Sequence, residues 1–449
     1  MKKLKKLIGI PFSDFEEMIK PSNRNEEPQI YVRSAALIPT TKVGDEMALT
    51  SIFLSSIRLI KEFRDTVLKE IKFPRSGKNY YYTEVSFHKN IFDGRFDGMI
   101  VNVSGSKIRD AVFFEMKNGK NDLDKNQIDK YIKFVKSGLK VNNLVTISNQ
   151  FVSDVRETPI EHLKVPPSFN LYHLSWTYLL TIAHILLFDN DDNIEDIDQI
   201  EIMNEVVRYF ENDKSGILNH SSMSEGWKVV SDKIFRNERL LKSDKLLRSA
   251  VNSWHQKERD LALLLSRNLG ANIKSCKRGK KDLDNGINKL LKSHILDGSI
   301  IIKEAISNLN IKLDFIRRSV TFSVVLTPPS DKTNNGKVSF LYKQLEKCRK
   351  KEGELYDSIV NDILIEPDFK FLKNQPNYSL KTFRDENFRT HNDIQKFTIH
   401  YTKNLKGSFP SRNKFVSEID QMTLKFYEGI VQHLSNWKKP PPKVDNFNA

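Results

Sequence analysis

The chain has 449 residues, which is more than one hydrophobic core usually organises, so two or three domains are expected. Lys and Arg total 72 against 57 Asp and Glu, which gives a formal net charge of +15 and favours a polyanionic partner, most commonly nucleic acid. A solvated lysine surface in a Lys- and Asn-rich composition is the alternative reading of the same charge.

Several classes of protein are excluded by simple features. The apolar stretch from Leu179 to Leu187 is too short to span a bilayer, so we expect a core helix there and no membrane partner. The basic start is followed by Pro11 and Asp14, which does not fit a signal peptide. Two distant cysteines, Cys276 and Cys348, fit a reducing compartment, and we therefore expect a cytoplasmic protein. No Gly-rich phosphate loop is present, which argues against ATP hydrolysis.

The first informative elements are two short runs rich in β-branched and aromatic residues. Ile100 to Val103 and Ala111 to Phe114 read as strands, and Ser104 to Lys107 between them reads as a turn. The sequence therefore predicts an antiparallel hairpin. A tyrosine-rich run before it ends at Glu84, in the context Thr83-Glu84-Val85.

Charged side chains stand at the ends of these strands. Asp97 precedes the first strand and Glu115 ends the second, so an antiparallel pairing places both at the same edge of the sheet. Lys117 is two residues after Glu115 and points to the same face. Asp93 is the alternative to Asp97, but Asp93-Gly94 reads as a turn and has no apolar strand directly after it.

Acids placed beside Val, Phe and Ile are costly to bury unless something binds them, so these residues indicate a metal site. Oxygen ligands without clustered Cys or His favour Mg²⁺ or Mn²⁺ over zinc. Asp97 and Glu115 would hold the ion, and Glu84 would bind a second ion or orient a water molecule. Lys117 would stabilise developing negative charge or help to deprotonate the attacking water. A Glu at a strand edge that pairs with a lysine is the other reading of Glu84.

Asp97, the Glu115-x-Lys117 pair and Gln127 in a following helical pattern resemble the motif of the PD-(D/E)XK nuclease superfamily, which has the restriction-endonuclease-like fold. Phe96 stands where that family often has a proline. The helical pattern from Leu123 to Ser137 and the strands at Leu144 to Ser148 and Leu171 to Leu174 are similar to the order of that family's core. The resemblance implies that Gln127 faces the metal edge from its helix, and it implies phosphodiester hydrolysis.

Beyond this core, a boundary is expected at the acidic segment Asp189 to Asn193, after which helical patterns predominate. We expect a nuclease-like domain over 1–190, a helical domain over 191–298 and an α+β domain over 299–449, with strands near Ile300 and Val320 only. The segments around His173–Trp176, Asp198–Tyr209 and Phe340–Leu345 resemble a group of uncharacterised bacterial proteins that join a nuclease-like domain to an extended C-terminal region.

The fold class predicted is thus α/β, with a restriction-endonuclease-like mixed sheet flanked by helices and a mainly helical α+β C-terminal region. The function predicted is a metal-dependent nuclease, more an endonuclease than an exonuclease, acting on DNA in anti-phage defence or DNA repair. The C-terminal part would bind substrate, mediate oligomerisation or regulate the nuclease, with a homo-oligomer or a partner protein as the expected assembly. The competing hypothesis is a catalytically silent module that keeps the fold and binds nucleic acid.

Overall fold

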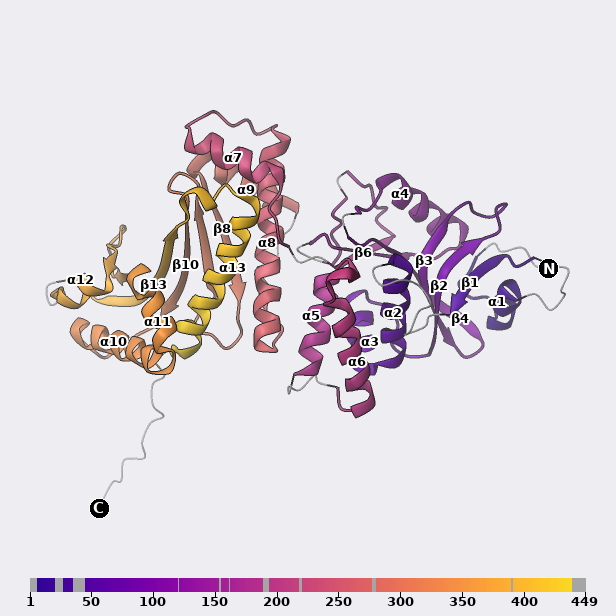
Figure 1. Ribbon diagram of the computed structural model, residues 1–449, viewed down its shortest axis with the longest axis horizontal. Helices are drawn as coiled ribbons and strands as arrows, with labels where there is room; N and C mark the ends of the chain where they lie inside the picture. The colour runs from indigo at the N-terminus through magenta and orange to yellow at the C-terminus, as the bar shows by residue number, and fades with distance from the viewer. Residues whose placement is uncertain are drawn as a thin grey trace, which may run out of the picture. The chain divides into compact units, whose positions relative to one another are not determined.

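Two units make up the chain in the computed structural model, which describes residues 6–20, 27–34, 45–119, 121–152, 155–160, 162–188, 194–217, 220–276, 280–388 and 391–437. Unit 1 comprises Met1–His220 together with Ser266–Asn272, and unit 2 comprises Ser221–Leu265 and Ile273–Ala449. Both units combine a sheet with helices (Figure 1). No helix among the described residues is long and apolar enough to cross a membrane.

Unit 1 is built on a six-stranded mixed sheet with the order β1-β2-β3-β4-β5-β6. The first four strands pair antiparallel, and β5 and β6 run parallel to β4. The strands are β1 (Ile30–Ser34), β2 (Lys78–Phe87), β3 (Arg95–Ser104), β4 (Lys107–Met116), β5 (Asn143–Ser148) and β6 (Asn170–Ser175). The helices are α1 (Phe12–Ile19), α2 (Glu46–Leu59), α3 (Lys61–Glu70), α4 (Lys125–Lys133), α5 (Trp176–Leu187) and α6 (Ile197–Phe210).

The predicted hairpin is confirmed as β3 and β4. Ser104 pairs with Lys107 across a two-residue turn, in which Gly105 takes a φ of +60° that suits glycine best. The predicted strands near Leu144 and Leu171 are confirmed as β5 and β6, and the predicted helix after Leu123 is confirmed as α4. Because α4 joins β4 to β5, the two strands are parallel, as a helical crossover requires.

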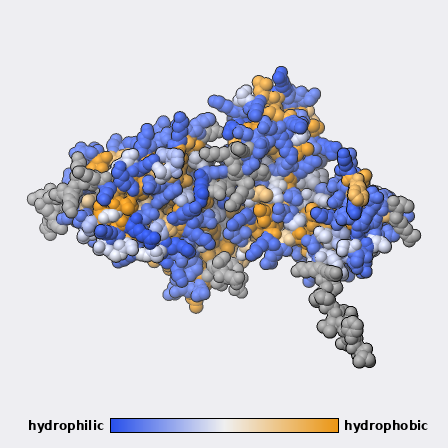
Figure 2. Space-filling model, turned by 180° about the vertical axis from the view of Figure 1, so that it is seen from behind, coloured by the Kyte–Doolittle hydropathy of each residue, from blue (hydrophilic) through white to orange (hydrophobic). Residues whose placement is uncertain are grey.

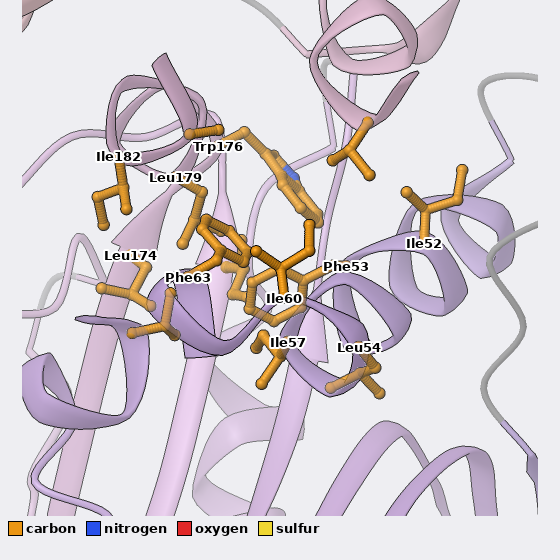
Figure 3. Packing of buried hydrophobic residues seen from close by; sticks show 14 of the residues in the cluster. Ile52, Phe53, Leu54, Ile57, Ile60, Phe63, Leu174, Trp176, Leu179 and Ile182 are labelled. Atoms are coloured by element: carbon orange, nitrogen blue, oxygen red, sulfur yellow. The ribbon is translucent and has the colours of Figure 1, made fainter. Parts of the chain in front are cut away.

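Neighbouring strand residues enter two separate cores because successive side chains of a strand point to opposite faces. Phe114 of β4 packs with α2, α3, α5 and α6, whereas Phe113 packs with α1 and α4. On the first face Phe53 lies 6.0 Å from Trp176 between ring centroids and 6.5 Å from Phe63, and Figure 3 shows these rings meeting above the sheet. With both faces covered, β5 and β6 are buried almost throughout.

The structure divides the chain differently from the predicted boundary after residue 190. Helix α6 belongs to unit 1 because its apolar side Met203, Val206 and Phe210 joins the core of α2 and α5. Phe210 lies 5.8 Å from Trp176 between ring centroids. The acidic segment Asp189 to Asn193, on which that boundary was based, lies outside the described residues. An acidic, Asn-containing run interrupts helical periodicity whether it separates two domains or two helices of one core.

This placement of α6 predicts that Val206→Ala lowers the free energy of unfolding by about 2 kcal/mol, because it removes fully buried methyl groups and leaves a cavity. Thermal unfolding followed by near-ultraviolet circular dichroism measures the change. Glu205→Ala on the same helix is the matched control, since Glu205 is 62% exposed and should change the value by less than about 0.5 kcal/mol. Equal effects of the two substitutions would place α6 outside the core.

Unit 2 is built on a seven-stranded antiparallel sheet with the order β12-β11-β13-β10-β9-β8-β7. Its strands are β7 (Lys274–Ser275), β8 (Ile295–Ile301), β9 (Leu309–Asp314), β10 (Ser319–Leu326), β11 (Ile363–Phe369), β12 (Tyr378–Ser379) and β13 (Ile394–Asn404). Its helices are α7 (Glu225–Phe235), α8 (Lys245–Leu269), α9 (Lys280–Ser293), α10 (Asn334–Lys351), α11 (Gly353–Ile359), α12 (Leu380–Asp385) and α13 (Arg412–Gly429). The last residues of α8, from Ser266 on, are assigned to unit 1.

The strand content of unit 2 is larger than the sequence indicated. Strands near Ile300 and Val320 are confirmed as β8 and β10, but β9, β11 and β13 complete a single sheet, so a separate helical domain over 191–298 is not observed. In β11 and β13 buried and half-exposed residues alternate, with Pro367 inside β11 and Lys396 and His400 in β13. These residues hide the strand signal because one face of the sheet is polar.

Candidate metal and phosphate site

Asp97 and Glu115 meet at one edge of the unit 1 sheet, as the hairpin predicts. Gly98 pairs with Phe114, which places Asp97 opposite the end of β4. The Asp97 carboxylate accepts a hydrogen bond from the Met116 backbone N–H at 2.6 Å, between Oδ2 and N. Both acids are buried, with exposed fractions of 7% for Asp97 and 1% for Glu115. Two carboxylates are therefore held side by side in a largely dry setting.

Lys117 connects this pair to a third acid from another element. Its Nζ lies 2.8 Å from Glu115 Oε1 and 2.9 Å from Glu46 Oε1. Glu46 is the first residue of α2, and the side chain of Asp45 before it caps that helix by accepting from the Met47 N–H. Acids from α2 and β4 thus contact one ammonium group beside Asp97 of β3. The main chain at Lys117 is held by the hydrogen bond from its N–H to the Ile147 carbonyl.

The electrostatics of the cluster follow from its burial. Burial raises the pKa of Asp97 well above its usual range, and the nearby Glu115 charge raises it further. Burial also raises the pKa of Glu115, although Lys117 partly offsets this. For Lys117 burial alone would lower the pKa, but the charges of Glu115 and the hydrogen bond to Glu46 outweigh it and the pKa lies above its ordinary value. Lys117 is therefore a stable cation beside acids that are costly to ionise.

Glu84 occupies the right position in the sheet but has another partner. It lies opposite Asp97 in the β2–β3 register, between the pairs Thr83–Gly98 and Val85–Phe96. Its backbone has a φ of +55°, which is rare for a residue with a side chain, and its Oε2 lies 2.8 Å from Arg95 Nη1. Glu84 is thus ion-paired at the strand edge, with Arg95 rather than with the lysine of the alternative reading, and the cluster contains Glu46 instead.

Gln127 is connected to the site indirectly, by a hydrogen bond to a tyrosine. Gln127 of α4 donates from Nε2 to Tyr131 Oη at 2.9 Å, and Tyr131 Oη donates to the Arg95 backbone carbonyl at the start of β3. Burial raises the pKa of Tyr131 to about 12, with a further contribution from the nearby Glu115 charge. The amide of Gln127 thus orients a hydroxyl group that faces the same edge of the sheet.

The other two residues weighed from the sequence are now placed. Asp93 is exposed on the turn before β3, whereas Asp97 is buried in the cluster, so the structure favours Asp97. Phe96 is fully buried, with its ring centroid 4.2 Å from that of Tyr131 and 4.6 Å from that of Phe113. Phe96 therefore packs α4 onto the sheet directly beside the acids.

Sequence reasoning missed Glu46 and Tyr131. The signal for Glu46 was an acid directly after the capping Asp45 at the start of an apolar helix, but such an acid usually serves only the helix dipole. The signal for Tyr131 was its spacing of one helical turn from Gln127 on the face that carries Ile128. Neither pattern shows which distant carboxylates the residue will meet.

The donor set fits a hard divalent cation. Glu115 Oε2 is buried and has no hydrogen-bond donor among the described residues. An oxygen atom in that condition is suited to a cation or a polar ligand. Within the described part of the chain, no group of three or more His, Cys, Asp or Glu side chains has a geometry that would hold a metal by itself. In this structure Lys117 Nζ lies between the carboxylates of Glu115 and Glu46.

Comparisons with known proteins add no assignment: no family model, no curated protein and no solved structure matches this chain.

Proposed function

We propose that unit 1 is a PD-(D/E)XK-type nuclease with the restriction-endonuclease-like fold, which hydrolyses phosphodiester bonds in nucleic acid, DNA in the first place, with Mg²⁺ or Mn²⁺. The observation that carries the proposal is the convergence of Asp97, Glu115 and Lys117 on one edge of a mixed sheet, with Lys117 Nζ 2.8 Å from Glu115 Oε1. Burying such charges lowers stability, and this cost is typical of functional sites.

The arrangement of elements supports the same proposal. An antiparallel β2-β3-β4 meander is followed by the α4 crossover and the parallel strands β5 and β6, with α2 preceding the meander. This is the element order that the sequence resemblance implies. Each acidic or basic residue of the motif stands at or just beyond the end of a strand, at one edge of the sheet.

Asp97 and Glu115 would hold the divalent ion together with water and substrate phosphate oxygens, and the ion when bound polarises a phosphoryl oxygen and lowers the pKa of a coordinated water molecule. Lys117 remains protonated, so its role is to stabilise negative charge on the phosphate rather than to act as the general base. Tyr131, oriented by Gln127, would hold the start of β3 beside the same edge by donating its hydroxyl proton to the Arg95 backbone carbonyl. Arg95, at 53% exposed, is placed to contact a neighbouring phosphate.

A cleavage assay with the full-length chain tests the proposal. Supercoiled plasmid, linear duplex DNA, single-stranded DNA and RNA are incubated with Mg²⁺, Mn²⁺ or EDTA, and the products are separated on gels. We expect cleavage with Mg²⁺ or Mn²⁺ and none with EDTA, and conversion of supercoiled plasmid to the nicked form would identify endonuclease action. Binding of nucleic acid without cleavage under any of these conditions would favour the silent binding module.

A further inference from the structure

Phe371 of unit 2 is the most exposed large hydrophobic side chain among the described residues, with 88% of its surface accessible. It lies in the loop between β11 and β12, next to Leu372, which is 45% exposed. Hydrophilic residues cover most of the face seen in Figure 2, and apolar residues occur there as scattered patches. An exposed ring of this kind is informative only if the loop holds it in place.

The loop is held by the side-chain amide of Gln375. Its Oε1 accepts a hydrogen bond from Phe369 N at 3.0 Å. Its Nε2 lies within hydrogen-bonding distance of the Leu372 carbonyl at 2.8 Å, the Phe369 carbonyl at 3.1 Å and Asp368 Oδ1 at 3.1 Å. Lys370 N also donates to the Asp393 carbonyl at 2.9 Å. The tip is therefore an ordered turn with a defined direction for Phe371.

The backbone at Phe371 is unfavourable for a residue with a side chain. Its φ of +66° lies in the left-handed region, where glycine would cost least. A phenylalanine at this position combines a strained backbone with an apolar ring left in water. Both features lower the stability of the free protein, so the residue is best explained by a ligand that contacts the ring.

The positive charges of the lysines in this loop indicate the chemical class of the ligand. Lys370 Nζ lies 4.9 Å from the Phe371 ring centroid, and Lys373 follows Leu372 as a second exposed cation. An aromatic face with one lysine beside it and a second exposed lysine two residues further on combines a surface for stacking with donors for phosphate, as in proteins that bind single strands. Asp368, the acid that precedes the loop, accepts a hydrogen bond from Gln375, so its carboxylate helps to hold the turn.

We propose that the tip formed by Lys370, Phe371, Leu372 and Lys373 binds nucleic acid by stacking Phe371 on an unstacked base while the two lysines contact the adjacent phosphates. This inference rests on the proposed function for its choice of nucleic acid as the partner. It adds a substrate-binding element in unit 2 and specifies that element's preference for single-stranded or locally opened strands.

Binding of a fluorescent single-stranded DNA of mixed sequence to the full-length protein, measured by anisotropy in EDTA, tests the tip. Phe371→Ala should weaken this binding roughly tenfold, whereas Phe371→Trp should retain it and show quenching of the new tryptophan. The matched control is Phe235→Ala, because Phe235 is also exposed, at 58%, and has Arg318 at 3.9 Å from its ring centroid. It should bind as the wild type does.

Polyphosphate, which has charge but no bases, separates stacking from electrostatics. Phe371→Ala should bind polyphosphate as tightly as the wild type, whereas Lys370→Gln combined with Lys373→Gln should weaken binding of both polymers and reduce the salt dependence. Gln375→Ala should weaken DNA binding with Phe371 still present, because the turn is no longer held.

If the wild type and the Phe371→Ala variant bind DNA equally tightly, the proposal that Phe371 stacks on a base is wrong. That result leaves the nuclease proposal standing. Phe371-dependent binding without any cleavage supports the tip and contradicts the nuclease. If Phe371→Ala leaves DNA binding unchanged but abolishes binding to vesicles of anionic lipid, the tip contacts a membrane surface and the proposal is wrong.

Discussion

Replacing Glu115 with Gln, or Asp97 with Asn, should lower the rate of DNA cleavage by at least about a hundredfold, because each change removes a charge that holds the divalent ion at the reacting phosphate. Lys117→Ala should have an effect of similar size, since Lys117 Nζ is the cation nearest Glu115 Oε1 in the described cluster. Cleavage is measured from the first-order loss of supercoiled plasmid at saturating Mg²⁺.

Two further groups of variants sharpen this result. Asp93→Asn is the matched control, because Asp93 is an exposed acid just before the same strand and should cleave at the wild-type rate. Glu46→Gln should lower cleavage, and the effects of Glu84→Ala and Gln127→Ala should be smaller than that of Glu115→Gln. A Glu115→Gln variant that cleaves as fast as the wild type would show that the cluster is not the catalytic site.

The second large effect concerns stability in the absence of metal. Asp97→Asn should raise the free energy of unfolding by roughly 1–3 kcal/mol at neutral pH in EDTA, because the wild type must either ionise a buried carboxylate beside Glu115 or hold a proton that the unfolded chain releases. The amide oxygen of Asn can still accept the Met116 N–H, so this hydrogen bond is retained. Thermal unfolding of the wild type and the variant measures the difference.

The pH dependence of this difference has a defined sign. The pKa of Asp97 is raised in the folded protein, so its contribution to stability is complete below the ordinary aspartate pKa and is lost as the pH rises through the folded pKa. The advantage of Asp97→Asn over the wild type should therefore grow from about pH 4 upwards and then level off. A difference that shrinks with rising pH would mean that the Asp97 carboxylate is stabilised, not destabilised, by its surroundings.

Divalent metal should reverse the order of stability. At about a hundredfold excess over its dissociation constant, Mg²⁺ or Mn²⁺ would stabilise the wild type by about 2.7 kcal/mol and raise its unfolding temperature. Asp97→Asn and Glu115→Gln should show little of this shift, whereas Asp93→Asn should show all of it. The measurement needs no substrate, so it tests the metal site separately from cleavage. An equal shift in all four proteins would place the bound metal elsewhere.

The sequence by itself determined the hairpin of β3 and β4 and the meeting of Asp97, Glu115 and Lys117. These depend on local features: β-prone runs, a Gly-containing turn, and the two-residue period of strand side chains. Once two strands are antiparallel and adjacent in the chain, the residues at their far ends must lie at one edge. The same locality explains why α4, β5 and β6 were predicted correctly.

Only the tertiary structure decided the rest. Glu46 enters the cluster from a helix that lies far away in the sequence, and Glu84 leaves it through a left-handed backbone and an ion pair with Arg95. Helix α6 joins unit 1 because of the core it completes, and β11 and β13 form because they pair with each other. In each case the deciding free energy comes from burial and pairing between distant segments, which no local pattern of residues records.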